Sequence, residues 1–592
     1  MHELGSDPEV KSVLGNYWRR KGYDENLVSQ IKQSFNVDDL TAQMVSSRVD
    51  SAEQVGKFLD PKIKDHLPDP FHLLDMDKAV SRVVSAIKNK EKICIFADYD
   101  VDGATSAALL KRYFDEIQVQ AGIYVPDRIA EGYGPTAESM HTIKSSGYSL
   151  VITVDCGSLA FEALEYSSEI GLDMVVLDHH IGAEVLPKAI AIVNPNRLDE
   201  TSEYKNLAAV GVSFLFVVAL NKTLKETDFF THDFKSPDVI KYLDLVALGT
   251  VCDVMTLTGL NRTFVAQGLK VAKKRTNIGY KVLAEVAAID EAINCYHLGF
   301  VLGPRINAGG RVGKSSLGAN LLSTTNEEEA YDIAKELEKY NQERKAIEFA
   351  VMQEAIEIAK LQEDNDSIFV VGSGWHQGVI GIVAGRLKEK YNKPVAVIAV
   401  IDGIAKASCR SVKGVDYGGA ILEAKLKGYI SAGGGHEMAA GFTASEDKLE
   451  ELKEFLSARF ASSMKDSSAH ITKYYEYDLT TSSVNFDLLD KIKILEPFGN
   501  GNVPPTFRFS EVFVLKADVA ANNHIRFILA PTQDAYGHKA LKGIAFNAVG
   551  TPIADALLSA KARKLDVLGQ LKLNKWQDSE SIQLQLADIF YC

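Results

Sequence analysis

The chain has 592 residues, of which 46% are hydrophobic and 24% charged, which is enough to build several hydrophobic cores. Its longest apolar run, residues 210–220, is shorter than the roughly 18 residues that a membrane span requires, and the N-terminus carries no secretory pattern. We therefore expect a cytoplasmic protein with no membrane partner. The net charge of −14 argues against a wide nucleic-acid-binding surface, although it allows a narrow basic channel, and six scattered cysteines argue against a zinc site or a disulfide framework.

The predicted elements begin with a polar, mixed segment at residues 1–70, which is typical of a small helical cap. Short apolar runs then alternate with helical stretches, a spacing that predicts a mostly parallel sheet with helices on both faces. These runs lie at residues 93–97, 121–125, 150–154, 174–177 and 191–193. Residues 207–275 are predicted to be helical and to end this first domain.

Residues 327–360 contain no glycine or proline and predict a helix about 50 Å long that connects two lobes. Thr325 and Glu328 have the spacing of a capping box at its start. A second α/β unit follows and closes near residue 461, and the remaining residues show alternating strands typical of a small closed β-barrel. The predicted domains are residues 1–70, 71–320, 321–364, 365–462 and 463–592.

Three predicted strands of the first domain run directly into acidic or imidazole side chains. Because the carboxyl ends of parallel strands meet at one edge of the sheet, these side chains are expected to lie close together. Divalent cations such as Mn²⁺ or Mg²⁺ would relieve the repulsion between the carboxylates and suit a site with one or two imidazoles. A single Asp after a strand is more often a helix cap, and Asp178 fits a cap or an orienter of its neighbours. The residues are Asp98, Asp100 and Asp102 after the first strand, Asp155 after the third, Asp178, His179 and His180 after the fourth, and Asp253, where an apolar helix is predicted to end at Gly249.

In chain order, the strings DYDVDG, VDCGS, LDHH and GTVCDV resemble the four motifs of the DHH phosphoesterase superfamily. The resemblance implies that His180 faces the scissile phosphate, and it leaves the role of Asp102 open. Many relatives place a histidine ligand where this chain has Cys94, a departure that fits the RecJ branch of the superfamily. The resemblance also implies that a pair of divalent ions, Mn²⁺ or Mg²⁺, is bound by Asp98, Asp100, Asp155, His179 and Asp253.

Further strings, at residues 126–134, 303–311, 374–386, 407–411, 433–441 and 496–502, resemble the RecJ exonucleases in particular. The resemblance implies an α/β fold with a parallel-sheet DHH domain and a smaller α/β DHHA1 domain joined by the long helix, followed by a C-terminal OB-fold barrel. It implies that the DNA contacts come from Arg128, Arg305, Arg311, Trp375, His376, Ser408, Arg410 and His436. From the residues alone, the arginines at 128, 305 and 311 fit surface cations equally well, and the tryptophan at 375 fits a core position.

The barrel offers four candidates for contact with single-stranded bases, Phe507, Phe509, Arg526 and Lys572, although aromatic residues in β-structure more often belong to the core.

The expected activity is a 5′→3′ exonuclease that hydrolyses single-stranded DNA to 5′-mononucleotides by two-metal catalysis, in DNA repair and recombination. Family analogy adds a single-strand-binding protein and a RecQ-type helicase as partners, and we expect a monomer. Two alternatives stay open. One is a DHH phosphodiesterase of short oligonucleotides or cyclic dinucleotides, whose chains are usually near half this length and lack the barrel. The other is a non-catalytic single-strand-binding module, which intact acids at all four motifs disfavour.

Overall fold

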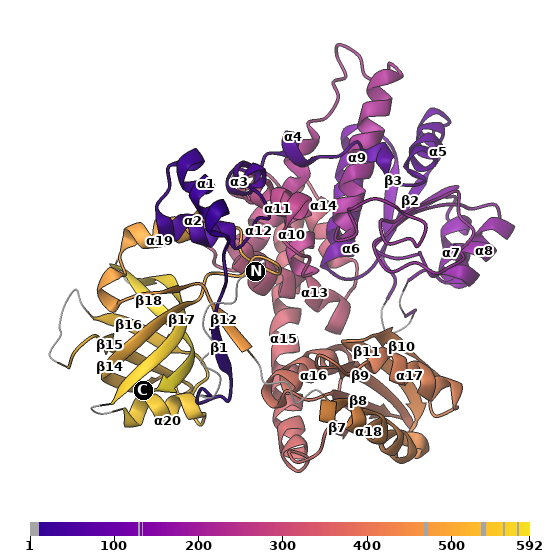
Figure 1. The fold of residues 1–592 in the computed structure, drawn as a ribbon. Helices are drawn as coiled ribbons and strands as arrows, with labels where there is room; N and C mark the ends of the chain where they lie inside the picture. The colour runs from indigo at the N-terminus through magenta and orange to yellow at the C-terminus, as the bar shows by residue number, and fades with distance from the viewer. Residues whose placement is uncertain are drawn as a thin grey trace. The chain divides into compact units, whose positions relative to one another are not determined.

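The computed structural model describes residues 11–127, 131–132, 134–466, 472–533, 540–560, 563–576 and 579–592, which fold as two compact units (Figure 1). One unit comprises Pro68–Met255 and Gln267–Ala469, and the other comprises Met1–Leu67, Thr256–Ala266 and His470–Cys592. Among the residues described, no helix is both long enough and apolar enough to cross a lipid bilayer.

The first unit contains a five-stranded sheet in the order β3-β2-β4-β5-β6, and every neighbouring pair is parallel. β2 and β4 are buried at all of their positions, as expected for a parallel sheet that is covered on both faces. Helices α7 and α8 cover one face, and α6 and α9 pack on the other. The bounds are α5 Met76–Lys88, β2 Ile93–Ala97, α6 Val101–Glu116, β3 Ala121–Tyr124, α7 Ala137–Ser145, β4 Leu150–Val154, α8 Phe161–Glu169, β5 Asp173–Leu177, β6 Ala191–Val193 and α9 Ala209–Glu226.

A series of shorter helices follows this sheet. Helix α10 runs to Cys252, so the prediction that it ends at Gly249 is wrong. A Cβ atom at Gly249 would lie only 2.5 Å from Thr105 Oγ1 and 2.7 Å from Val210 Cγ1, so this glycine allows close helix packing and does not stop the helix. The elements are η2 Val239–Tyr242, α10 Leu243–Cys252, α11 Gly259–Ala272, α12 Ile278–Val286, η3 His297–Leu302, α13 Gly303–Val312 and α14 Leu317–Ser323.

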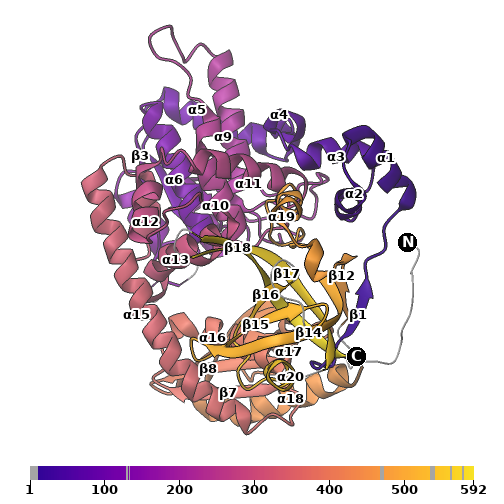
Figure 2. The same ribbon diagram turned by 90° about the vertical axis from the view of Figure 1, so that its left-hand side faces the viewer.

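The long helix α15 spans Glu327–Lys360, as predicted, and links the two domains of this unit (Figure 2). It packs against α12, α13 and α14 and, farther along, against α16 and β7. Its N-cap is Asn326, whose side chain accepts the N–H groups of Glu328 and Glu329 at 2.9 and 3.3 Å. The predicted capping box at Thr325 is therefore wrong by one residue.

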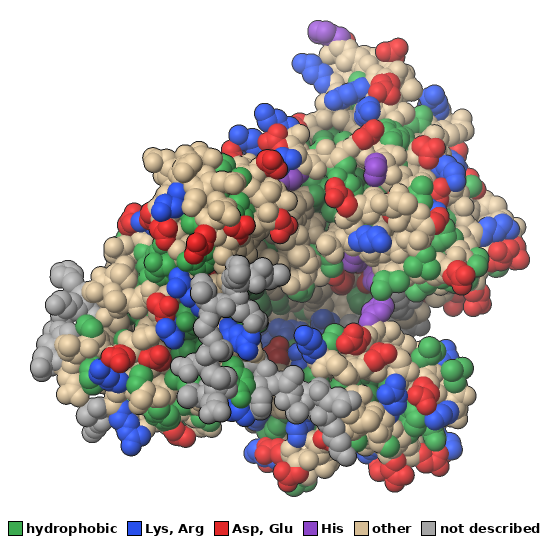
Figure 3. Space-filling view, in the orientation of Figure 1, with side chains coloured by type: hydrophobic (Ala, Val, Ile, Leu, Met, Phe, Trp, Pro, Cys, Tyr) green, Lys and Arg blue, Asp and Glu red, His purple; other side chains and the backbone are tan. Residues whose placement is uncertain are grey.

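The smaller domain has a five-stranded sheet in the order β10-β11-β9-β8-β7, in which only β7 and β8 run parallel. Helix α16 packs on one face, and α17 and α18 pack on the other. Figure 3 shows a recess between this domain and the parallel-sheet domain, with histidine side chains at its margin. The bounds are β7 Ile368–Ser373, α16 Gln377–Tyr391, β8 Val395–Ile401, β9 Ile404–Arg410, α17 Tyr417–Leu426, β10 Ala432–His436, β11 Ala439–Ser445, η4 Glu446–Lys448 and α18 Leu449–Asp466.

The second unit is built around the predicted β-barrel. Its strands follow the order β14-β15-β16-β18-β17, and β17 pairs back with β14, which closes the barrel. Phe507 and Phe509 are fully buried in its core, so neither can stack on a base as the sequence suggested. The bounds are β13 Tyr477–Asp478, η5 Thr481–Ser483, α19 Phe486–Lys493, β14 Phe507–Ala520, β15 His524–Ala530, β16 Leu541–Ala545, α20 Pro552–Ser559, β17 Lys564–Trp576 and β18 Ser579–Tyr591.

The N-terminal segment belongs to this barrel unit. It is mainly helical, as predicted, but it also contains a strand, β1, that pairs in parallel with β12. Ile31, Val45 and Val55 share one buried apolar cluster with barrel residues, which explains why the segment folds with the C-terminal part of the chain. The bounds are β1 Tyr17–Arg20, α1 Glu25–Phe35, α2 Asp39–Ser46, α3 Ala52–Leu59, α4 Ile63–His66 and β12 Thr472–Tyr475, and the short helix η1, Pro70–His72, already belongs to the first unit.

Candidate metal centre

The sheet of the first unit aligns the acidic segments at one edge. The last residues of β2, β4 and β5 lie in register, and the ladder continues for one residue beyond each strand. The backbone N–H of Asp98 donates to the carbonyl of Val154 at 3.3 Å, and that of Asp155 donates to Leu177 at 3.1 Å. The acidic segments that follow the three strands therefore start side by side, at the same position along the strand direction.

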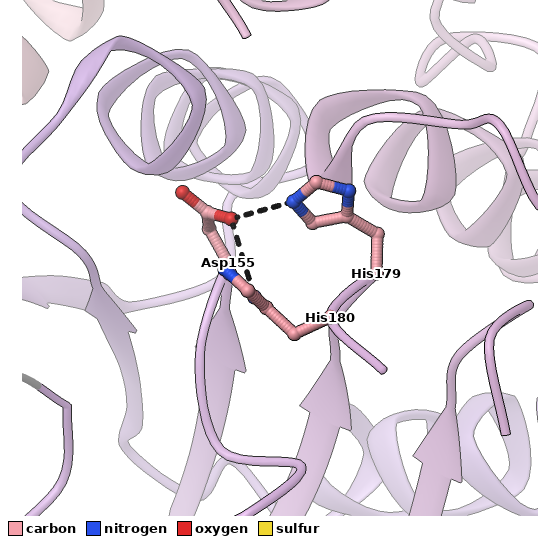
Figure 4. Close-up of side chains that lie close together, drawn as sticks. All are labelled: Asp155, His179 and His180. Atoms are coloured by element: carbon pink, nitrogen blue, oxygen red, sulfur yellow. Dashed lines mark ion pairs between the residues drawn. The ribbon is translucent and has the colours of Figure 1, made fainter. Parts of the chain in front are cut away.

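These residues form three overlapping groups in which the possible ligand atoms all lie within 4.8 Å of one another. Asp155 and His179 each belong to two of the groups, so neighbouring cation positions would share ligands (Figure 4). The groups are Asp98, Asp100 and Asp155; Asp155, His179 and His180; and Asp102, His179 and Asp253.

His179 lies at the centre of this arrangement. Its Nε2 is 3.3 Å from a carboxylate oxygen of Asp155 and 3.5 Å from one of Asp253. Burial, with a smaller contribution from the charge of His180, lowers the pKa of His179 to about 4. The ring is therefore neutral at physiological pH, which is the form that binds metal ions.

The ring of His180 is held by Asp178, which lies two residues earlier in the chain. Its Nδ1 lies 2.8 Å from Asp178 Oδ1, and the same carboxylate accepts the N–H groups of His179 and Ser158. Burial alone would lower the pKa of His180, but the hydrogen bond to Asp178 and the negative charges of Asp178, Asp253 and Asp98 together outweigh it and raise the pKa to about 9. Asp178 thus orients its neighbours, one of the two roles that its sequence position allowed. Because Nδ1 faces Asp178, any contact of this ring with a phosphate uses Nε2.

The carboxylates of the site destabilise one another's charged form, because their negative charges repel. Burial, followed by repulsion from Asp100, Asp102 and Asp98, raises the pKa of Asp155 well above its usual value. Burial and Asp100 raise the pKa of Asp253 to about 7. A cation bound here would remove this penalty, and a set of carboxylates with one or two imidazoles is the donor set that Mn²⁺ and Mg²⁺ prefer. The residues therefore fit a divalent cation.

The role of Asp102, which the sequence left open, is visible in the structure. Its two carboxylate oxygens accept the N–H groups of Ala209 and Val210 at 2.6 and 2.9 Å, at the start of α9. Although it also belongs to one of the possible metal groups, its side chain joins the DYDVDG segment to the helix that covers the sheet.

Two asparagines were missed by the sequence analysis. The side chain of Asn194 donates to the carbonyl of His180 at 2.8 Å, and that of Asn196 donates to the carbonyl of His179. Both fix the backbone of the histidine pair from the loop after β6. The sequence did contain a signal for these two asparagines, because Asn194-Pro195-Asn196 directly follows a predicted strand at the same edge of the sheet.

Most of the predicted DNA-contacting residues that the structure describes gather around the first turns of α16. Arg410 Nη1 donates to Ser408 Oγ at 3.3 Å, and a Cβ atom at Gly381 would lie 3.1 Å from that oxygen. Arg311 Nη1 donates to the carbonyl of Gly378 at 3.0 Å, and His376 is the N-cap of α16. His436 is exposed at the end of β10.

Two of the predicted DNA contacts make contacts within the protein. Arg305 Nε lies 2.6 Å from a carboxylate oxygen of Glu338, which ties α13 to α15. The indole of Trp375 is 5% exposed and donates to Glu354 at 2.8 Å within the core beside α16. Trp375 therefore takes the core position that the residues alone also allowed, and the DNA contact of Arg305 stays a prediction. Arg128 lies outside the described residues.

Comparison with known proteins agrees with this arrangement. The DHH family N-terminal domain model matches residues 92–250, the DHHA1 domain model matches 365–462, and the RecJ OB domain model matches 475–588. The single-stranded-DNA-specific exonuclease RecJ of Haemophilus influenzae is 33% identical over 89% of this chain and 92% of its own. The RecJ of Bacillus subtilis is 30% identical over 96% of this chain and 70% of its own.

Among solved structures, RecJ from Thermus thermophilus in complex with Mn²⁺ superimposes with a TM-score of 0.80 at 25% identity, covering 97% of this chain and 79% of that one. The expected fold, with a DHH domain, a DHHA1 domain and an OB domain, is confirmed. The chain belongs to the RecJ family of single-stranded-DNA-specific exonucleases.

Proposed function

We propose that this protein degrades single-stranded DNA from the 5′ end and releases 5′-mononucleotides, in DNA repair and recombination. The observation that carries the proposal is the crowded acidic edge of the parallel sheet, in which buried carboxylates surround a neutral imidazole. Family membership supplies the substrate class, because the curated relatives are single-stranded-DNA-specific exonucleases.

In this proposal, Asp98, Asp100, Asp155, His179 and Asp253 hold two divalent ions, Mn²⁺ or Mg²⁺. Such ions, when bound, lower the pKa of a water molecule and neutralise charge on the leaving oxygen. His180, whose raised pKa keeps it protonated near neutral pH, offers a positive ring to a phosphate next to the carboxylates. Asp178 holds that ring through Nδ1, which orients Nε2 for this contact.

The proposed 5′→3′ direction depends on the residues around α16. Ser408, Arg410 and Arg311 would bind the terminal 5′-phosphate or the adjacent backbone, with His376 and His436 as further contacts. A helix N-terminus and arginine side chains both favour anions, and a terminal phosphate carries more charge than an internal one. We also propose the predicted domain boundaries, a monomeric state, and a single-strand-binding protein and a RecQ-type helicase as partners.

A time course with Mn²⁺ tests the activity, with a single-stranded oligonucleotide labelled at either end compared with its duplex. We expect immediate release of labelled mononucleotide from the 5′ end, gradual shortening of the 3′-labelled strand, and little cleavage of the duplex. Hydrolysis restricted to pieces of two to five nucleotides or to cyclic dinucleotides would instead support the oligonucleotide phosphodiesterase, and binding without hydrolysis would support the non-catalytic module.

A further inference from the structure

Two exposed aromatic side chains lie stacked on a segment that packs against the end of α10, next to Asp253. The ring centroids of Tyr296 and Phe300 are 5.5 Å apart, and the ring planes differ by only 24°. The two residues are 63% and 73% exposed, so solvent reaches most of both side chains. Single exposed apolar residues are common on protein surfaces, but two stacked rings one helical turn apart form a continuous aromatic patch.

The segment that carries these rings is fixed from its other side. Leu298 and Leu302 of η3 are buried, and Cys252 Sγ donates to the carbonyl of Leu298 at 3.3 Å. A Cβ atom at Gly303 would lie 2.5 Å from the same sulfur, which shows how closely the two segments pack. The inner side of η3 therefore contacts the end of α10, and its outer side presents the rings.

This contact places the rings close to the chemistry. The residue after Cys252 is Asp253, whose carboxylate lies 3.5 Å from Nε2 of His179. On the C-terminal side, η3 continues directly into α13, whose Arg311 binds the first turn of α16. The aromatic pair thus belongs to a segment that contacts the metal edge at one end and leads to the α16 cluster at the other.

We infer that Tyr296 and Phe300 form a stacking platform for unpaired bases of the single-stranded DNA that the metal centre cuts. The inference rests on the proposed function and extends it from the cleaved phosphate to the bases of the strand. Bases stack on aromatic side chains whatever their sequence, whereas the bases of a duplex are already stacked on one another. The platform would therefore favour single strands without selecting a sequence.

The test uses Tyr296→Leu and Phe300→Leu, singly and together, in an Asp155→Ala background without divalent metal. Leucine keeps an apolar side chain but removes the π surface, and thermal melting monitors the fold. Fluorescence anisotropy with a labelled single-stranded 20-mer measures affinity. We expect binding to weaken by about tenfold per ring, within the range measured for base stacking on aromatic residues. The matched control is Phe349→Leu on α15, which removes a ring that is 67% exposed, and it should bind like the parent.

A second readout reports stacking directly. An oligonucleotide with 2-aminopurine at successive positions should show quenched fluorescence at one or two positions with the parent, and recovered fluorescence with the double variant. Unchanged affinity and unchanged quenching in the double variant would overturn the platform, and they are also the outcome expected if this surface binds a protein instead of DNA. Failure of the wild-type protein to release nucleotides would refute the proposed function but would leave both binding readouts interpretable.

Discussion

The acidic edge of the parallel sheet and the polar cluster around α16 differ in how completely the protein fixes them. At the acidic edge, Asp155 and Asp178 are almost inaccessible, and backbone N–H groups and imidazoles hold the carboxylates in place. Around α16, Ser408 and Arg410 are half-buried, and Arg410 donates hydrogen bonds to Ser408 and to the carbonyl of Cys409 on their own strand. The protein alone fixes the carboxylates of the acidic edge, whereas the side chains of Ser408 and Arg410 keep hydrogen-bonding groups for a ligand.

The largest expected effect comes from the residue that two of the possible metal groups share. Asp155→Asn keeps the size of the side chain but removes a charge that two cation positions would use. We expect cleavage of single-stranded DNA to fall by at least about a thousandfold, because the lost stabilisation amounts to several kcal/mol. Single-strand binding, measured by anisotropy, should survive. Equal losses of binding and cleavage would indicate unfolding or a wrong assignment of the site.

Asp178→Asn tests whether the acidic edge also depends on residues that touch no metal. Removing the carboxylate that faces His180 Nδ1 should lower the pKa of His180 from about 9 towards its usual value, since the hydrogen bond to Asp178 and the charge of Asp178 are the two largest causes that raise it. We expect a loss of about 10- to 100-fold in activity or metal affinity, as for other residues that orient catalytic groups. NMR titration of the histidine ring in the metal-free protein would measure the pKa.

The control for this variant is Asp173→Asn, which changes the first residue of the same strand, at the opposite end from the site. If both variants lost activity equally, the effect would come from the stability of β5 and not from the orientation of His180.

Arg410→Ala probes the α16 cluster, where a ligand would supply the missing contacts. The ratio of cleavage rates for 5′-phosphorylated and 5′-hydroxyl strands should fall by about 10- to 100-fold, the value of one or two hydrogen bonds to a charged group. Competition between the two substrates measures the ratio. Lys390→Ala in the last turn of α16 removes a positive charge at the other end of the helix and should leave the ratio unchanged. An unaltered ratio in Arg410→Ala would remove this arginine from recognition of the 5′ end.

The contrast between the two regions also explains what could be predicted from the sequence. Acidic residues at the ends of buried strands share one edge of a parallel sheet by geometry alone, so the convergence of Asp98, Asp155 and His179 followed from the strand pattern. The long helix was equally predictable, because its lack of glycine and proline is a local property.

Predictions about single side chains on helices and loops were less successful. The sequence showed arginine and tryptophan in family motifs, but not that Glu338 would pair with Arg305 or that Glu354 would receive the indole N–H of Trp375. Such partners lie many residues away in the chain, and only the packing of α15 brings them together. Strand β1 was missed for the same reason, since its partner β12 is more than 400 residues later.

The smallest expected effect is a pH dependence of the free energy of unfolding that arises from the acidic edge and not from the rest of the molecule. In the metal-free protein, Asp253 has its pKa raised to about 7 and His180 has its pKa raised to about 9. In the folded state both groups hold protons that the unfolded chain releases, so the free energy of unfolding should fall as the pH rises to about 7 for Asp253 and from about 6.5 to 9 for His180. A divalent ion competes with the proton of Asp253, one of the proposed ligands, and its stabilising effect should therefore grow as the pH rises through about 7.

Thermal melting with excess Mn²⁺ or with a chelator, at pH 6.5 and pH 8, measures this effect. An ion at about 100 times its dissociation constant adds roughly 2.7 kcal/mol, which corresponds to a rise in Tm of roughly 5–10 °C. The rise should be larger at pH 8 than at pH 6.5, and it should shrink at both pH values in Asp155→Asn. A rise that is independent of pH would mean that the ion binds away from Asp253, because binding of a cation by that carboxylate must release its proton.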